Sequence, residues 1–182
     1  NLTKSFPADR KETEGKLMYN FTLQIPTRIH FGKDTISYLS ELKEYGDKVL
    51  LVYGGGSIKK NGIYDTAMQL LKDAALKVFE LSGVEPNPRI ETVRKGVAIC
   101  KEEGIDMVLA IGGGSTIDCS KVIAAGAKYD GDAWDLVLDA TKIKAALPIF
   151  DVLTLSATGT EMDPFAVISD LTKNEKWGTG SP

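Results

Sequence analysis

The sequence predicts an α/β fold in which helices cover both faces of a parallel sheet. Three short apolar runs, at 48–53, 107–111 and 148–155, have the composition of strands that are buried on both sides. Segments with the apolar spacing of amphipathic helices lie between these runs. Because strands and helices alternate along the chain, we expect the sheet to be Rossmann-like, with ligands at the carboxyl ends of its strands.

The composition is that of an ordinary globular chain. Its 182 residues are 43% hydrophobic and 26% charged, which is enough for one domain with a sizeable core. The net charge of −3 and the pI near 5.3 provide no positive field for nucleic acid or for an anionic membrane. Cys100 and Cys119 lack the spacing of a redox pair or a zinc site, so we expect a reducing, cytoplasmic location.

The chain changes character near Met18. Residues 1–17 are polar and have no face to bury, as in a disordered leader or a cloning remnant. From Met18, apolar residues on both sides of Pro26 predict a hairpin or strand pair at an edge of the sheet, able to pair with another chain. His30, the one histidine of the sequence, is expected to face outward from the second of these strands rather than to act as a ligand or a base.

Helices and one further strand are expected around the three apolar runs. Asp34 is expected to cap the first helix, and Gly104 to end the third. Together these elements predict one domain over residues 18–176, with residues 177–182 as a tail. In order, the elements are helices at 34–43 and 62–75, a strand at 77–81, helices at 90–103 and 116–127, and a helical turn at 134–138.

Two glycine clusters follow predicted strands and are candidate phosphate-binding loops. In the second cluster a helix begins at the serine, so bare backbone N–H groups meet the positive end of the helix dipole. One glycine would be enough for a tight turn, which is the alternative interpretation, whereas three favour a cradle for a diphosphate. The clusters are Gly54, Gly55, Gly56 and Ser57, and Gly112, Gly113, Gly114 and Ser115.

Neither cluster fits the Rossmann fingerprint Gly-x-Gly-x-x-Gly. Lys59 stands where the first cluster would need its third glycine, and Ile117 stands at that position in the second. The sequence therefore predicts a nucleotide-binding α/β fold of another kind, in which two strand ends each carry a glycine loop.

Four motifs stand in order along the chain. They are Pro-Thr-Arg-Ile-His-Phe-Gly at 26–32, Glu-Pro-Asn-Pro at 85–88, Gly-Gly-Gly-Ser-Thr-Ile-Asp at 112–118 and Thr-Leu-Ser-Ala-Thr-Gly-Thr-Glu at 154–161. Together they resemble the amino-terminal half of the iron-type alcohol dehydrogenases, in the butanol dehydrogenase and aldehyde reductase branch, over residues 18–176. The resemblance implies hydride transfer between a nicotinamide cofactor and a primary alcohol or aldehyde, such as butanol or butanal.

The resemblance also implies cofactor contacts, most of which have a structural alternative. The loop at 112–115 would hold the diphosphate, with Asp118 beside it on the first helical turn, where an acid also suits the helix dipole. Asn87 would line the adenosine side, or be an ordinary turn residue between two prolines. The further implied contacts are the hydroxyl groups of Thr154 and Thr158, for which turn chemistry is the alternative, and the weaker positions Val167 and Lys176.

The first glycine cluster favours NADP(H), with NAD(H) as the alternative. A site for NAD usually places an acid at a strand end to bind the ribose 2′-OH, and here no acid follows Tyr53 before Asp65. Ser57 together with Lys59 or Lys60 would suit a 2′-phosphate, although lysines that are merely solvated at a helix start are the plain alternative.

The family resemblance implies an iron or zinc site in a helical second half, which this sequence does not include. We therefore expect no catalytic and no metal-binding residue here, and a chain that binds the cofactor without turning over substrate. Exposed apolar surface would favour a homo-oligomer, such as a dimer.

Two other interpretations stay open at this point. One is a related metal-dependent enzyme, either a polyol dehydrogenase or an enzyme like dehydroquinate synthase, which shares the fold and the Gly-Gly-Gly-Ser loop. The other is a non-catalytic nucleotide-binding or assembly module.

Overall fold

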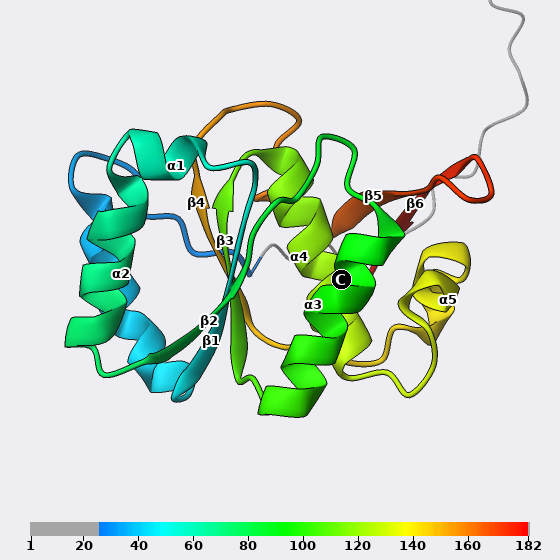
Figure 1. The fold of residues 1–182 in the computed structure, drawn as a ribbon, viewed down its shortest axis with the longest axis horizontal. Coiled ribbons are helices and arrows are strands. Elements are labelled where there is room, and N and C mark those ends of the chain that lie inside the picture. Colours follow the sequence, from blue (N-terminus) through cyan, green and yellow to red (C-terminus); the bar gives the residue numbers. More distant parts are fainter. Residues whose placement is uncertain (1–25, 182) are drawn as a thin grey trace, which may run out of the picture.

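The computed structural model describes residues 26–181, which contain two sheets (Figure 1). The larger sheet is parallel and has the strand order β2-β1-β3-β4. The smaller is an antiparallel hairpin of β5 and β6. The parallel sheet with its helices confirms the predicted fold class. The strands are β1 (Lys48–Tyr53), β2 (Lys77–Leu81), β3 (Met107–Gly112), β4 (Ile149–Leu153), β5 (Phe165–Asp170) and β6 (Glu175–Gly180).

Helices lie on both faces of the parallel sheet (Figure 1). None of those in residues 26–181 is long and apolar enough to cross a membrane. On one face are η1 (Thr35–Tyr45), α1 (Ser57–Lys60) and α2 (Ile63–Asp73). On the other are α3 (Ile90–Glu103), α4 (Gly114–Ala127) and α5 (Ala133–Leu138), and the short turn η2 (Ala140–Lys142) follows α5 before the chain enters β4.

The central strands are buried on both sides. Leu51 of β1 belongs to the core cluster of α2, whereas its neighbours Leu50 and Val52 belong to the cluster of α3 and α4. All three side chains are 0% exposed, and burying one of this size stabilises the fold by about 1.5–3 kcal/mol. Burial on both faces explains why β1 and β3 are continuous apolar runs rather than alternating patterns.

The strand order creates a topological switch point between β1 and β3. From β1 the chain passes through α2 to β2, and it then returns through α3, on the other face, to β3 on the far side of β1. Tyr53 at the end of β1 is paired with Ile111 of β3, so both strands end at the same edge of the sheet. In open α/β sheets, ligands bind in the crevice where such strand ends diverge.

The predicted strand at residues 29–31 is wrong. These residues are exposed and irregular, and within residues 26–181 no strand pairs with them. Within residues 26–181 this segment has no strand to pair with, so its strand-forming side chains do not by themselves produce a strand. His30 is exposed as expected, but its ring stacks on Tyr38, with the ring centroids 3.7 Å apart. The other half of the predicted strand pair, at residues 18–25, lies outside the described residues, as does the leader at 1–17.

Of the two helix ends predicted from single residues, the structure contradicts the first and confirms the second. The first helix is a 3-10 helix that continues to Tyr45, and Asp34 does not cap it: its φ is 60° and its side chain makes no capping hydrogen bond. Instead the Asp34 carbonyl accepts hydrogen bonds from the backbone N–H and the hydroxyl of Ser37. Gly104 ends α3 as predicted, with a left-handed φ of 62° and its N–H bonded to the Cys100 carbonyl.

The β5–β6 hairpin is absent from the sequence prediction. Strand β6 crosses the domain boundary expected at residue 176, and its Trp177 is paired with Ile168 of β5. Ile168 is 0% exposed and belongs to the core cluster of α3 and α4. The Ser169 amide donates to the Pro88 carbonyl at 2.9 Å, so the hairpin is also bound to the loop that follows β2.

Candidate functional site

Four loops meet at the carboxyl edge of the parallel sheet. The first glycine cluster connects β1 to α1, and the second connects β3 to α4. The loop that follows β4 joins the second cluster, because the Thr154 amide donates to the Gly112 carbonyl at 2.9 Å. The loop that follows β2 joins the end of β1 in the same way, with Val84 N–H bonded to the Tyr53 carbonyl at 3.1 Å. Both predicted glycine loops therefore lie at the switch point.

Two of the glycines are explained by the fold itself. A Cβ atom on Gly112 would lie 2.5 Å from the Thr116 hydroxyl oxygen, so a side chain there would collide with α4. Gly56 has a φ of 101°, which side chains of L-residues rarely allow. For these two positions the plain structural explanation is sufficient.

Three other glycines have no such explanation. A Cβ atom on Gly55 would meet nothing within 4 Å, and on Gly113 or Gly114 it would make only ordinary contacts, at 3.6 and 3.5 Å. None of the three has a positive φ. Gly113 and Gly114 stand at the N-terminus of α4, a helix of 14 residues whose first N–H groups are free of intrahelical partners. Bare backbone at this place suits the close approach of an anion.

The structure brings together three residues that are distant in the sequence. The Asn87 backbone N–H donates to the Ser115 hydroxyl at 3.3 Å. The Lys176 ammonium donates to the Asn87 side-chain oxygen at 2.7 Å. Asn87 has a left-handed φ of 56°, a conformation that asparagine tolerates better than most residues. The turn interpretation of Asn87 is thus compatible with its backbone. Its backbone N–H is bonded to Ser115 in the first turn of α4 and its side chain to Lys176 of the hairpin, so the residue as a whole links these two elements.

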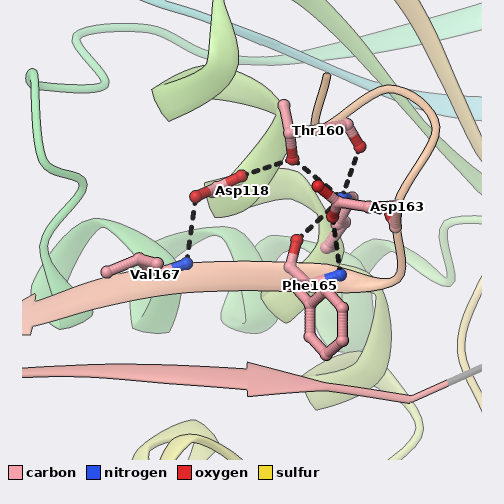
Figure 2. A network of polar contacts seen from close by, with 6 residues as sticks. Asp118, Thr160, Asp163, Phe165 and Val167 are labelled. Carbon is pink, nitrogen blue, oxygen red and sulfur yellow. Dashed lines mark hydrogen bonds and ion pairs between the residues drawn. The ribbon is translucent and has the colours of Figure 1, made fainter. Parts of the chain in front are cut away.

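Asp118 faces the protein rather than open solvent (Figure 2). One carboxylate oxygen accepts from the Thr160 hydroxyl at 2.6 Å, and the other accepts from the Val167 amide at 2.9 Å. The predicted contacts Thr154 and Thr158 are exposed in the loop after β4, and Val167 is 38% exposed on β5. Lys121, which is not among the predicted site residues, donates to carbonyl groups of the loop that follows β4.

A second polar group lies beside the first glycine cluster. The hydroxyls of Tyr53 and Tyr64 both donate to the Glu80 carboxylate, at 2.7 and 2.9 Å. The Lys59 ammonium lies over both tyrosine rings, 5.1 and 4.4 Å from their centroids. Burial, followed by the hydrogen bond to Glu80, raises the pKa of Tyr64. This acid comes from the neighbouring strand β2 and not from the loop after β1, so no pattern in that loop predicts it.

A cavity of about 300 Å³ lies between α4, β4 and the hairpin. It is lined by Lys121 and by Asp151 and Glu161, among others, and by none of the predicted cofactor contacts. Burial, followed by the nearby charge of Glu161, raises the pKa of Asp151 to about 6. The cavity therefore adjoins the loop that follows β4, although none of the predicted cofactor contacts lines it.

The described residues provide no metal centre and no reactive thiol. Within residues 26–181 no group of three or more His, Cys, Asp or Glu side chains is arranged to hold a metal ion. Burial raises the pKa of both Cys100 and Cys119 to about 12, so the two thiols stay protonated.

An open parallel sheet with glycine loops at its switch point is the architecture of nucleotide-binding α/β domains. Comparison with models of protein families identifies one family of this class. The model of the family "Iron-containing alcohol dehydrogenase" matches residues 26–182. The chain therefore belongs to the iron-containing alcohol dehydrogenase family.

Curated relatives agree with this assignment. The chain is 62% identical over 160 residues to NADH-dependent butanol dehydrogenase B of Clostridium acetobutylicum, covering 87% of this chain and 41% of that protein. It is 44% identical over 162 residues to the NADPH-dependent aldehyde reductase YqhD of Escherichia coli, covering 87% of this chain and 41% of the relative. The chain thus spans about two fifths of the length of these relatives.

Solved structures give the same result. NADH-dependent butanol dehydrogenase A of Thermotoga maritima matches with a TM-score of 0.86 and 49% identity, over 90% of this chain and 42% of that one. The structure of Escherichia coli YqhD matches with a TM-score of 0.84 and 43% identity, over 89% and 42% of the two chains.

Proposed function

We propose that residues 26–181 form the dinucleotide-binding half of an oxidoreductase that transfers a hydride between a nicotinamide cofactor and a primary alcohol or aldehyde. Butanol and butanal are the substrates we would test first, since butanol dehydrogenases are among the relatives. The observation that carries the proposal is the group of glycines at the switch point, Gly55, Gly113 and Gly114, whose missing side chains neither packing nor backbone conformation requires.

In this proposal the dinucleotide lies across the strand ends. The amides of Gly113 and Gly114 bind the diphosphate at the N-terminus of α4. The loop after β2, with Asn87, receives the adenosine side, and the loop after β4, with Thr154 and Thr158, receives the nicotinamide side. The sheet order β2-β1-β3-β4 is consistent with a ligand that spans the strand ends, since the two outer loops lie on opposite sides of the glycine loops. When bound, the cofactor would donate a hydride to an aldehyde in its reduced form or accept one from an alcohol in its oxidised form, and these residues would bind and orient it.

The choice between NADP(H) and NAD(H) remains a prediction. Lys59, Lys60 and Ser57 support a 2′-phosphate, as argued from the sequence. Two observations favour NAD(H) instead: Glu80 places a carboxylate beside the end of β1, and the relative at 62% identity is named NADH-dependent. YqhD, which is named NADPH-dependent, is 44% identical. The ratio of the two affinities, measured on one sample, decides between them.

The family description implies iron, but the described residues do not provide a set of ligands that fits it. We therefore assign no step of the chemistry to a metal. We also propose that the chain by itself binds the cofactor without turnover. Steady NADPH or NADH consumption with butanal, persisting in the presence of a chelator, would contradict this part of the proposal.

Calorimetric titration with NADPH, NADH and ADP tests the proposed function. We expect saturable binding of at least one dinucleotide, together with weaker binding of ADP, which lacks the nicotinamide side. Binding of none of the three ligands would overturn the proposal and would favour a module that does not bind nucleotides.

A further inference from the structure

We propose that Asp118 and Lys121 are positioning residues that act through the Thr160 hydroxyl. They hold the loop at 154–164 and the start of β5 in the shape that receives the nicotinamide side of the dinucleotide. The inference rests on the proposed function, since the loop is assigned there to the nicotinamide side.

The two charged residues lie on the same face of α4. They are three positions apart, a spacing that brings side chains together on a helix surface. Figure 2 shows Asp118 beside the loop that carries Thr160 and Asp163. The Lys121 side chain is only 16% exposed, so its ammonium depends on the protein for hydrogen-bond partners.

The Thr160 hydroxyl joins the two charges. It donates to the Asp118 carboxylate at 2.6 Å and accepts from the Lys121 ammonium at 2.8 Å. Thr160 is 3% exposed, so water does not readily replace either bond. One hydroxyl therefore uses both its donor and an acceptor to bind two opposite charges of α4.

Lys121 also binds the backbone of the loop. Its ammonium lies within hydrogen-bond distance of the carbonyls of Thr160, Asp163 and Phe165, at 2.6, 2.8 and 2.7 Å. The Asp163 carboxylate lies 3.2 Å away and balances the charge. Because three carbonyls converge on one cation of α4, the backbone over these residues is turned toward that helix.

Asp118 extends the attachment to the next strand. Its second oxygen accepts from the Val167 amide at 2.9 Å and so fixes the first part of β5. At the other end of the loop, the Thr154 amide is bonded to the Gly112 carbonyl. Thr154 and Thr158 therefore lie on a segment that is attached at both ends. Since each Asp118 oxygen accepts a hydrogen bond from the segment that it holds, we assign this residue a positioning role.

The experiment uses Thr160→Val, which keeps the shape of the side chain but removes the hydroxyl, and Thr160→Ser, which restores the hydroxyl. Lys121→Met tests the cation. Thr179→Val is the matched control, because Thr179 is also a buried threonine, 5% exposed, whose hydroxyl donates to the Leu136 carbonyl at 2.6 Å. Its partner in β5 is Ala166, which lies outside the loop at 154–164. Each variant is titrated with NADH, NADPH and ADP, and hydrogen–deuterium exchange of residues 154–164 is measured without ligand.

We expect Thr160→Val and Lys121→Met to reduce affinity for the better-bound dinucleotide at least tenfold and to leave ADP affinity within twofold. Exchange should increase at residues 154–164, and Thr160→Ser should recover most of the affinity and most of the protection from exchange. Thr179→Val should lower the melting temperature without either effect. Equal losses for ADP and the dinucleotide, unchanged exchange, or the same effects in Thr179→Val would overturn the inference. If the unsubstituted chain binds none of the three ligands, the proposed function fails, and with it the inference.

Discussion

Gly112 and Gly113 are neighbours, but an added methyl group would meet different surroundings at each. At Gly112 it would lie 2.5 Å from the Thr116 hydroxyl oxygen, whereas at Gly113 its closest contact would be 3.6 Å away, on Leu155. We expect Gly112→Ala to lower the free energy of unfolding by about 1–3 kcal/mol through overpacking. Gly113→Ala should leave stability nearly unchanged but reduce dinucleotide affinity about tenfold, or roughly 1.4 kcal/mol. Thermal melting and calorimetry of both variants separate the effects, and full affinity in Gly113→Ala would contradict the diphosphate assignment.

At the residue scale, the sequence could predict backbone sites better than side-chain partners. A glycine loop between a strand and a helix has a local signature, so the loop at 112–115 was found from its neighbours in the chain. The partners of Asp118 come from residues 160 and 167, and the partners of Lys121 from residues 160–165. Local sequence spacing cannot predict a contact between residues that are about 40 positions apart. The pair Asp118 and Lys121, three apart at the start of a helix, was the one signal available.

At the scale of elements, the hairpin connects the outer loop at Asn87 to the rest of the site. Lys176 of β6 binds the Asn87 side chain at 2.7 Å, and a hydrogen bond of this kind contributes about 0.5–1.5 kcal/mol. We therefore expect Lys176→Met to reduce ADP affinity about threefold to tenfold, with little change in melting temperature, because Lys176 is exposed. Lys173→Met, in the turn of the same hairpin, is the matched control and should bind ADP normally. Equal losses in both variants would point to a general charge effect.

The elements that the sequence predicts well are those whose burial leaves a clear pattern. Strands β1 and β3 are buried on both faces, which requires continuous apolar runs, and α3 has both its periodicity and its terminal Gly104. Strand β6 was missed because Glu-Lys-Trp-Gly-Thr-Gly is polar, rich in glycine and largely exposed. Conversely, residues 29–31 have strand-forming side chains, but no strand among residues 26–181 pairs with them. Pairing is a tertiary property, and local propensity alone does not determine it.

For the whole molecule, stability should depend on pH through two carboxylates with opposite behaviour. The hydrogen bond from Arg94 lowers the pKa of Asp132, so the stability from this pair is present above the unfolded pKa and is lost as the pH falls through the folded value. Burial raises the pKa of Asp151 from 3.8 to about 6, so the native state binds this proton more tightly than the unfolded chain does. Asp151 therefore destabilises the protein above pH 6, and this cost disappears as the pH falls toward 4.

The substitution Asp151→Asn tests this pH dependence. The variant should melt at a higher temperature than the unsubstituted protein at pH 8, and the difference should shrink between pH 6 and pH 4. Asp130→Asn, at an exposed position, should change the melting temperature little at any pH in this range. A difference for Asp151→Asn that is independent of pH would show that charge burial is not its cause.

The bond between Asn87 and Lys176 joins residues 89 positions apart. A ribosome makes all four strands of the parallel sheet before it reaches β6, so a nascent chain can bury most of its core while this corner is still incomplete. A ligand whose binding requires the contact between Asn87 and Lys176 would then bind only the completed fold. Such a ligand would stabilise that state by mass action. Nucleotide added to a refolding mixture should accordingly raise the yield of native protein without accelerating the earliest collapse.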